Sequence, residues 1–363
     1  MNKEKFVERL GQLVEIQTYS DNAKINAEAL DLIESWVDKK CVRERVSNGN
    51  TEILLLGSGD IMKPKIGYLV HVDVVKGNPE QFKMKSVGDK LLGRGVSEMK
   101  FSIPIGVELL NMAVRGELGQ DITLAITTDE EVGGGEGGKY LAEVMKFQPE
   151  IMVVPDGGDG FVFVNKAKGV VHLWVESHGV PAHASVPWDG SNALAPICRL
   201  ANVLLDKYEN NSKTKNWETT MNLGFLAGGK SANQVCPEAL LKIDFRFPET
   251  RSFEEIFTEV REMAGKIDSG LKVTIGASGN PTYTDINTEA VEKLLKAAET
   301  TLGKKMEVGG EYGASDARYW AKLNIPIIMT KPEGGDFHGD NEWISAQSCV
   351  KFYELMLAYI KSL

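Results

Sequence analysis

The sequence has few cysteines and few histidines. Among its 363 residues are four cysteines and five histidines. The cysteines lie far apart, without any C-x-x-C pair, at Cys41, Cys198, Cys236 and Cys349. This spacing argues against a disulfide framework and against a cysteine-rich zinc site. We interpret these residues as scattered thiols in a reducing compartment and expect a cytoplasmic protein.

The sequence also lacks a basic patch and long apolar runs. Lys and Arg number 41 against 51 Asp and Glu, which gives a formal net charge of −10. Without a basic stripe or a polybasic segment, we expect no nucleic-acid partner and no membrane partner. No apolar run approaches the roughly 18 residues of a membrane-spanning helix. Residues 3–15 have the charged, amphipathic character of a surface helix, not that of a signal peptide.

The order of apolar patterns predicts two domains, as the chain length also favours. Short apolar runs, typical of buried strands, alternate along the chain with segments whose apolar residues have helical spacing. This order predicts an α/β catalytic domain with a mixed, mostly parallel sheet. The expected strands are 52–56, 66–72, 121–127, 150–155, 306–310 and 325–330, and the expected helices are 3–15, 24–39, 102–115, 137–146, 287–302, 315–323 and 344–361. Between them, residues 169–278 follow a β-α-β-β-α-β order, which is typical of a ferredoxin-like α+β domain. We predict one domain of residues 1–167 and 280–363, with residues 168–279 inserted as a second.

Polar residues follow two of the apolar strands. His71 and Asp73 end one strand and point to one side of it, so the carboxylate could orient the imidazole while its other nitrogen binds a metal. Asp129, Glu130 and Glu131 follow another strand. Clustered carboxylates need a cation or a solvated turn to relieve their repulsion. A capped strand end and a solvated acidic loop are the structural alternatives.

Two further polar residues repeat this pattern. Asp156 follows the strand 150–155, and His338 lies in the glycine-containing loop FHGDNEW. A turn would explain each residue alone, but the repetition at strand ends favours a metal site. Imidazoles and carboxylates without thiolates are ligands of catalytic Zn²⁺, Co²⁺ or Mn²⁺. Two close metals would polarise a carbonyl, and a further carboxylate would take the proton of water.

The motifs together resemble the dinuclear zinc metallopeptidase family of acetylornithine deacetylase, succinyl-diaminopimelate desuccinylase, aminoacylase and carboxypeptidase G. They occur in the order H-x-D, G-R-G-x-x-(acid)-x-K, D-E-E-x-G, an acid after a strand, and H-G-x-x-E, over nearly the whole chain. The resemblance implies two zinc ions per chain, with cobalt or manganese as alternatives. It makes Glu130 the general base and gives Asp73 the role of orienting a ligand. The implied ligands of one metal are His71 and Asp156, those of the second are Glu131 and His338, and Glu98 has the position that bridges the two.

The chain departs from the family pattern at the bridging ligand. That residue is usually Asp in the family, and here it is Glu98, while Phe101 stands where Gly is common. The extra methylene moves the carboxylate by about one carbon–carbon bond, which is comparable to the tolerance of a preorganised site. Glu98 could bridge after a backbone adjustment, or it could favour one metal, alter the metal preference or lower activity. A surface acid is the structural alternative.

The inserted segment resembles the family's lid and dimerisation domain. Its stretch GVPAHASVPWDGSNAL implies a homodimer in which His183 stabilises the oxyanion in the partner subunit's active site, whereas a hydrogen bond at a helix start is the structural alternative. Arginine suits a substrate carboxylate because its guanidinium binds both oxygens. A solvated strand face or a helix start would also explain these positions. The predicted substrate-binding residues are Asn233, Arg246, Ser315 and Arg318.

These observations predict a hydrolase that deacylates an N-acyl amino acid, such as an acetylated or succinylated one. The expected partner is a small-molecule substrate with a free carboxylate. A dipeptidase or carboxypeptidase of the same family is an alternative, which Asp156 in its PDGG setting keeps open. An alternative of another class is a weakly active or inactive ligand-binding relative, because Glu98 replaces the bridging Asp.

Overall fold

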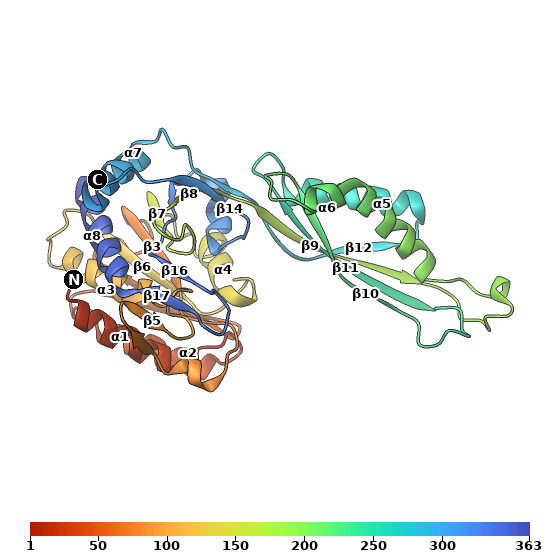
Figure 1. The fold of residues 1–363 in the computed structure, drawn as a ribbon, viewed down its shortest axis with the longest axis horizontal. Coiled ribbons are helices and arrows are strands. Elements are labelled where there is room, and N and C mark those ends of the chain that lie inside the picture. Colours follow the sequence, from red (N-terminus) through yellow and green to blue (C-terminus); the bar gives the residue numbers. More distant parts are fainter. The chain divides into compact units, whose positions relative to one another are not determined.

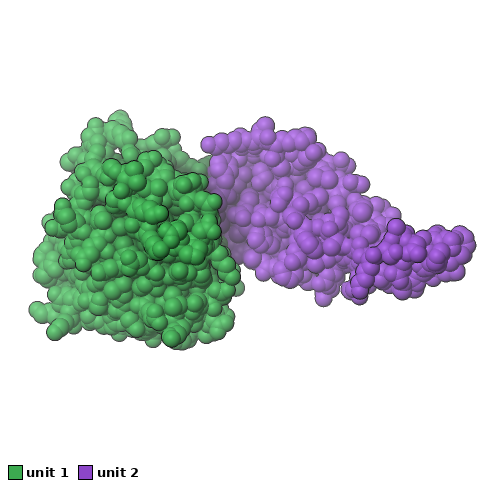
Figure 2. Space-filling view, turned by 60° about the horizontal axis from the view of Figure 1, so that its bottom comes forward, with its two compact units in different colours: residues 1–166, 283–311, 315–363 green, residues 167–282, 312–314 purple.

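The computed structural model describes residues 1–363 and divides into two compact units, coloured separately in Figure 2. Unit 1 comprises Met1–Lys166, Tyr283–Glu311 and Ser315–Leu363, and unit 2 comprises Ala167–Thr282 and Tyr312–Ala314. No helix has the length and apolar character needed to cross a membrane. The catalytic and lid roles assigned to the two segments stay predictions.

Unit 1 is built on a six-stranded sheet with the order β1-β2-β6-β3-β7-β15. Its strands β6, β3 and β7 are labelled in Figure 1. Its strands are β1 (Val42–Asn48), β2 (Thr51–Gly57), β3 (Ile66–His71), β6 (Ile122–Thr127), β7 (Ile151–Val153) and β15 (Ile327–Ile328). The pairs β1–β2 and β2–β6 are antiparallel, and the pairs among β6, β3, β7 and β15 are parallel. The predicted α/β fold with a mixed, mostly parallel sheet is confirmed.

Neighbouring residues of each strand enter cores on opposite faces of this sheet. On one face, Leu54 and Val70 belong to a core shared with five helices, α1 (Lys3–Glu15), α2 (Ala23–Ser35), α3 (Ser102–Val114), α7 (Glu289–Leu302) and α8 (Ala346–Ser362). On the other face, Leu55 and Leu69 pack with α4 (Gly138–Glu143) and the 3₁₀ helix η4 (Asp316–Leu323). Because helices cover both faces, the central strands β2, β3, β6 and β7 are mostly apolar. Polar residues follow the carboxyl ends of the parallel strands β3, β6 and β7.

Two small sheets add to unit 1. One has the order β13-β8-β14 and the other the order β16-β17-β5-β4. In the second sheet, Trp343 pairs with Leu92, which brings the segment around residue 340 beside the loop that follows residue 92. The strands are β4 (Lys85–Val87), β5 (Lys90–Leu92), β8 (Phe163–Ala167), β13 (Thr282–Tyr283), β14 (Val308–Glu311), β16 (Gly334–Gly335) and β17 (Trp343–Ser345).

Unit 2 is a four-stranded antiparallel sheet with the order β10-β11-β9-β12. Its elements are β9 (Gly169–His178), α5 (Leu194–Ser212), β10 (Thr220–Gly228), β11 (Glu238–Phe247), α6 (Phe253–Ile267) and β12 (Lys272–Gly279). Leu173 and Ile243 pack against Ile197 and Val260 in a separate core, whereas Trp174 points away from it and is exposed. The sheet therefore has one covered face, and the predicted β-α-β-β-α-β order is confirmed.

Several predicted elements of unit 1 differ in type or length, among them the segment 315–323, strand 325–330 and helix 137–146. The segment 315–323 forms a 3₁₀ helix, in which Ala317 and Trp320, three residues apart, both enter the core. Strand 325–330 shortens to β15 because its pairing partner changes. The Ile328 carbonyl accepts from the Val154 N–H, whereas the Met329 carbonyl accepts from the Val164 N–H. Helix 137–146 shortens to α4, since its last turn closes on the Tyr140 carbonyl.

Candidate metal centre

His71 is the last residue of β3 and is buried. Its Nδ1 lies 3.0 Å from the backbone oxygen of Asp73 and 3.4 Å from Oδ1 of the same residue. Both neighbours are acceptors, so we assign a proton to Nδ1. Burial lowers the pKa of His71, but the surrounding acids outweigh burial and raise it, which keeps Nε2 protonated in the absence of a metal. Nε2 is then the nitrogen that would bind an ion. Nε2 is buried without a hydrogen-bond partner. Such an atom is costly unless a cation or a hydrogen-bond partner satisfies it.

Asp73 connects His71 to the acidic turn that follows β6. Its carboxylate accepts from Ser20 Oγ at 2.7 Å and from the backbone N–H groups of Glu130 and Glu131 at 3.3 and 3.1 Å. Burial raises the pKa of Asp73, but its hydrogen bonds and the charge of His71 outweigh burial and lower it below the usual value. One buried carboxylate thus fixes both the imidazole and the next two candidate residues.

A group of three ligands forms around the free nitrogen of His71. Ligand atoms of His71, Glu98 and Asp156 all lie within 4.8 Å of one another. Glu98 Oε1 is 3.6 Å from His71 Nε2. Asp156 follows β7, and Glu98 comes from the loop after β5. The ends of β3 and β7 and the loop after β5 therefore bring these three residues together.

The charges of this group fit a bound cation. Burial, followed by the negative charges of Glu98 and Glu130, raises the pKa of Asp156 well above its usual value. Burial also raises the pKa of Glu98, but Lys331 and His71 bring it well below its usual value. Without a metal, a proton on Asp156 relieves the repulsion between these acids, and a divalent cation would displace that proton. The donor set and the unpaired Nε2 both fit such an ion.

The loop that carries Glu98 is held by a buried acid. Glu342 accepts from the backbone N–H groups of Gly95, Ser97 and Glu98 at 2.9, 2.9 and 3.1 Å. It also pairs with Arg94 at 2.9 Å, and both side chains are almost fully buried. Glu342 belongs to the H-G-x-x-E motif, but its role in shaping this loop was not predicted, because a backbone-binding carboxylate leaves no pattern in the sequence.

Glu130 lies beside the group with its carboxylate between two cations. Its Oε2 is 3.9 Å from His71 Nε2, and its Oε1 is 4.0 Å from Arg318 Nη1. Burial raises the pKa of Glu130 to about 8, an effect that His71 and Arg318 oppose and that Asp316 and Asp73 reinforce. A carboxylate whose pKa lies near neutrality can accept a proton and return it.

The remaining acids of the turn have separate partners. Glu131 Oε1 is 3.1 Å from His338 Nε2, so the two residues predicted for a second metal meet. Neither belongs to the group of three. Asp129 Oδ2 instead accepts from the backbone N–H groups of Glu136 and Gly137 at 2.9 and 3.0 Å. Asp129 therefore closes the glycine-rich turn.

A lysine that the sequence did not single out contacts Glu98. Lys331 Nζ lies 2.9 Å from Glu98 Oε2, and the lysine side chain is 5% exposed. A lone lysine after a short strand normally indicates a solvated side chain, so no sequence signal would have found this contact.

Two predicted substrate-binding residues of unit 1 are engaged within the protein. Arg318 Nη2 donates to the Gly133 carbonyl at 2.8 Å, and its side chain is 7% exposed. Ser315 caps η4 by accepting from the Ala317 N–H at 3.3 Å. These contacts favour the helix-start alternative for Ser315 and a positioning role for Arg318, and their binding of substrate stays a prediction.

In unit 2, His183 and Asn233 lie on neighbouring segments. The Ala184 N–H donates to the Asn233 carbonyl at 2.9 Å. The Ser185 N–H donates to His183 Nδ1 at 3.2 Å, so we assign the ring proton to Nε2. His183 is exposed, and its Nε2–H is thus a donor available to a ligand.

Arg246 of unit 2 lines a cationic pocket. Its guanidinium pairs with Asp244 through contacts of 2.8 and 3.0 Å. The pocket has a volume of about 320 Å³ and contains three cations and no carboxylate among its lining residues, which are Lys168, Thr214, Lys215, Asn216, Thr220, Arg246 and Tyr312. This composition suits a small anion.

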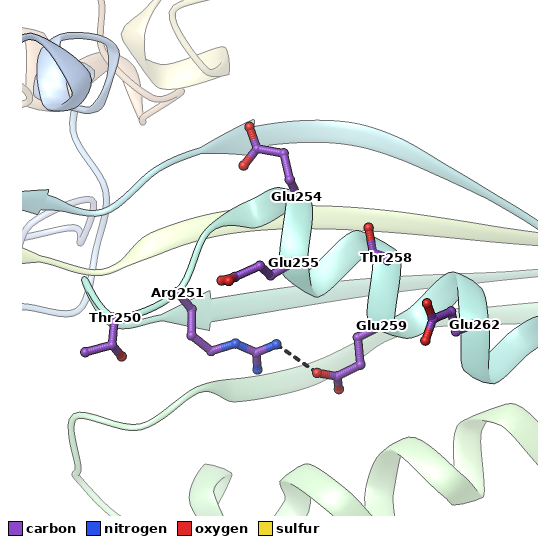
Figure 3. Close-up of a pocket in the computed structure, with 7 residues that line it drawn as sticks. All are labelled: Thr250, Arg251, Glu254, Glu255, Thr258, Glu259 and Glu262. Carbon is purple, nitrogen blue, oxygen red and sulfur yellow. Dashed lines mark hydrogen bonds and ion pairs between the residues drawn. The ribbon is translucent and has the colours of Figure 1, made fainter.

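A second hollow of unit 2 has the opposite charge. Figure 3 shows it beside α6, with several glutamates and Arg251. Glu255 forms the capping box of α6 with Ser252, and Glu259 pairs with Arg251 at 2.8 Å. These acids stabilise the helix and its surroundings, and no histidine or cysteine accompanies them.

Comparisons with known proteins decide the family. Residues 67–362 match the family described as Peptidase family M20/M25/M40. The chain belongs to this family. The M20 chain is 23% identical over 319 residues to succinyl-diaminopimelate desuccinylase of Marinobacter nauticus, covering 84% of each chain. It shares its fold with a Staphylococcus aureus tripeptidase (TM-score 0.78, 19% identity, 100% and 98% covered) and with a Sulfolobus solfataricus M20 metallo-carboxypeptidase (TM-score 0.81, 15% identity, 99% of each covered).

Membership confirms the predicted family and the predicted class of enzyme. The M20 chain is a metallohydrolase that acts on amide or peptide bonds, and the family implies divalent metal ions. At this level of identity, the substrate, the identity of the metal and the number of ions remain open to proposal.

Proposed function

We propose that this M20 chain is a zinc-dependent deacylase of N-acyl amino acids. The observation that carries the proposal is Glu130, a largely buried carboxylate that faces the unpaired Nε2 of His71. His71, Glu98 and Asp156 would hold the ion, with cobalt or manganese as alternative metals. The desuccinylase name of the Marinobacter relative supports this class of substrate.

The residues of the centre divide the chemistry among them. A bound ion would supply Lewis acidity, which would polarise the substrate carbonyl and lower the pKa of water. Glu130 takes a proton from water as it attacks and delivers that proton to the departing amine. Asp73 holds the His71 ring and the Glu130 backbone. Arg318 keeps the Glu130 carboxylate turned toward the centre.

We also propose that His183 donates to the oxyanion in a partner subunit's site. Its assigned tautomer presents an exposed Nε2–H, which suits developing negative charge. Dimerisation through unit 2 is supported by β10, an edge strand that exposes Phe225 and Leu226. An exposed apolar edge strand is a template for pairing with a second chain. The cytoplasmic location stays a prediction.

The substrate carboxylate is assigned to the cationic pocket of unit 2. Arg246 lines this pocket with Lys168 and Lys215. Asp244 neutralises the charge of Arg246, and the two lysines keep the pocket positively charged, so that it can attract an anion. Asn233 is assigned to the same substrate as a neutral hydrogen-bonding group.

A peptidase is the second candidate function. Asp156 in the PDGG segment favours it, and the proteins of similar fold include a tripeptidase and a metallo-carboxypeptidase. Both candidate enzymes would use the same metal centre. They differ in the group on the carbonyl side of the cleaved amide bond, which is an acyl group in one case and an amino-acid residue in the other.

A hydrolysis screen tests both candidates. Protein stripped with chelator and reloaded with Zn²⁺, Co²⁺ or Mn²⁺ is assayed on acetylated and succinylated amino acids, dipeptides and tripeptides. We expect the highest kcat/KM on an acylated amino acid with a free carboxylate. Preference for peptides would select the peptidase, and metal binding without any hydrolysis would select the ligand-binding relative.

A further inference from the structure

Glu98 divides its two carboxylate oxygens between different partners. Oε1 lies 3.6 Å from His71 Nε2, on the side of the group of three. Oε2 lies 2.9 Å from Lys331 Nζ. The carboxylate oxygen that is not on the His71 side is therefore already paired with a fixed positive charge.

Lys331 is held in this position by its surroundings. Its backbone N–H donates to the Gly158 carbonyl at 3.2 Å, and its carbonyl accepts from Phe161 at 3.0 Å. Its Nζ also lies 3.9 Å from the centre of the Phe337 ring, which favours a cation. Because the side chain is 5% exposed, Nζ cannot leave Glu98 for bulk water without moving its surroundings.

The ligands of a second ion are correspondingly incomplete. Glu131 and His338 contact each other at 3.1 Å but lie outside the group formed by His71, Glu98 and Asp156. The His338 side chain is 51% exposed. A second ion would have two protein ligands there, and the Lys331 ammonium would oppose its use of Glu98 as a third.

We propose that Lys331 takes the place of a second cation against Glu98, so that the centre holds one divalent ion tightly, at His71, Glu98 and Asp156. Lys331 is then a positioning residue that sets the number of ions. Glu131 and the half-exposed His338 remain as a weak second site. This inference rests on the proposed metal centre and replaces the expectation of two zinc ions per chain.

Metal counting tests the proposal without an activity assay. Stripped protein is incubated with Zn²⁺, desalted and analysed for zinc by mass spectrometry, and Co²⁺ binding is followed by calorimetry and by its visible spectrum. We expect one ion per chain in the natural protein. His71→Ala should lose it, and Glu131→Gln should keep it. Two tightly held ions, or an ion that needs Glu131 and survives His71→Ala, would overturn the proposal.

Substitution of Lys331 gives the second test. Lys331→Met removes the charge at similar length and should tighten second-ion binding by roughly ten-fold or more, the effect of a nearby unit charge even at the dielectric constant of water. Lys331→Arg keeps the charge and should remain at one ion. Lys331→Gln replaces the methionine variant where that variant does not fold, as judged by circular dichroism. Unchanged second-ion binding in the neutral variant would overturn the proposal.

The same counts separate this inference from the proposed function. Two tight ions in the natural protein would remove the role of Lys331 and leave the proposed hydrolase intact. No bound ion at all would remove the metal centre, and with it both proposals.

Discussion

Glu130 is the residue on which the proposed chemistry depends. Its carboxylate lies between His71 Nε2 and Arg318 Nη1, and its backbone N–H is held by Asp73. Glu130→Gln keeps the shape of the side chain but cannot accept a proton. We expect kcat to fall by roughly 10²–10⁴-fold, the usual contribution of a general acid–base group.

Zinc content should survive this change, because Glu130 is outside the group of three. The measurement is kcat together with zinc per chain, and Glu143→Gln on the exposed surface of α4 is the matched control. Full activity in Glu130→Gln would remove this residue from its assigned role.

The pH dependence of activity should reflect the pKa of Glu130. A base must be deprotonated, so kcat/KM should fall as the pH drops through the pKa of Glu130. Burial raises this pKa to about 8 without a bound ion, and a nearby divalent ion lowers it, so the midpoint in the loaded enzyme should lie below 8.

Arg318 provides the test of this assignment. Its positive charge lowers the pKa of Glu130, so Arg318→Met should move the acidic limb to higher pH, while Arg318→Lys should move it less. The measurement is kcat/KM against pH for the three proteins. An unmoved limb in Arg318→Met would assign the titration to another group.

Residue patterns at strand ends could be predicted, whereas supporting contacts could not. His71 and Glu130 follow apolar strands, and clustered acids in such places indicate chemistry. Lys331 and Glu342 act through contacts with residues more than 200 positions away, at Glu98 and in its loop. Only the folded chain brings these partners together.

At the scale of elements, the glycine-rich turn before α4 fits closely around Asp316. Gly134 has a φ of +59°, and a Cβ there would lie 2.1 Å from Asp316 Oδ1. The neighbouring Gly135 has no positive φ, and a Cβ added to it would meet no heavy atom within 4 Å, which makes it a matched control.

Gly134→Ala should therefore destabilise the protein, through a disfavoured backbone and a displaced buried carboxylate. We expect a loss of about 1–3 kcal/mol in the free energy of unfolding. Gly135→Ala should stay within about 0.5 kcal/mol of the natural protein. Urea unfolding compares the variants, and equal stabilities would contradict the close fit inferred for Gly134.

Elements with a clear period could be predicted, and short ones could not. Helix α1 begins after its N-cap Asn2 and matches its predicted range of 3–15. Strands β16 and β17 have only two and three residues, too few to display alternation. Strand β1 was not predicted because its sequence, VRERVSN, is that of a charged edge strand.

At the scale of the whole molecule, the inserted unit could be predicted from a change in the apolar pattern near residue 168. An antiparallel sheet that is covered on one face has alternating apolar residues, whereas a sheet covered on both faces has nearly continuous apolar strands. The assembly of two chains leaves a weaker signal. Edge strand β10 exposes Phe225 and Leu226, which supports pairing with a second copy but does not specify its register.

Subunit complementation tests the dimer and the trans role of His183 together. Glu130→Gln and His183→Ala should each be nearly inactive, because each lacks one group in every site. In a mixed dimer, the subunit that keeps Glu130 receives His183 from its partner, so one of the two sites is complete. If subunits exchange at random, half of the dimers are mixed, and about one quarter of the natural activity should return.

Differently tagged chains verify that mixed dimers form, and size-exclusion chromatography with light scattering reports the assembly. Co-expression of Glu130→Gln with a double Glu130→Gln, His183→Ala chain is the control, because no complete site can arise from that pair. Verified mixed dimers without recovered activity would place His183 in its own subunit's chemistry or outside it. A fully active monomer would exclude the trans arrangement altogether, since a single chain has no partner from which to receive the donor.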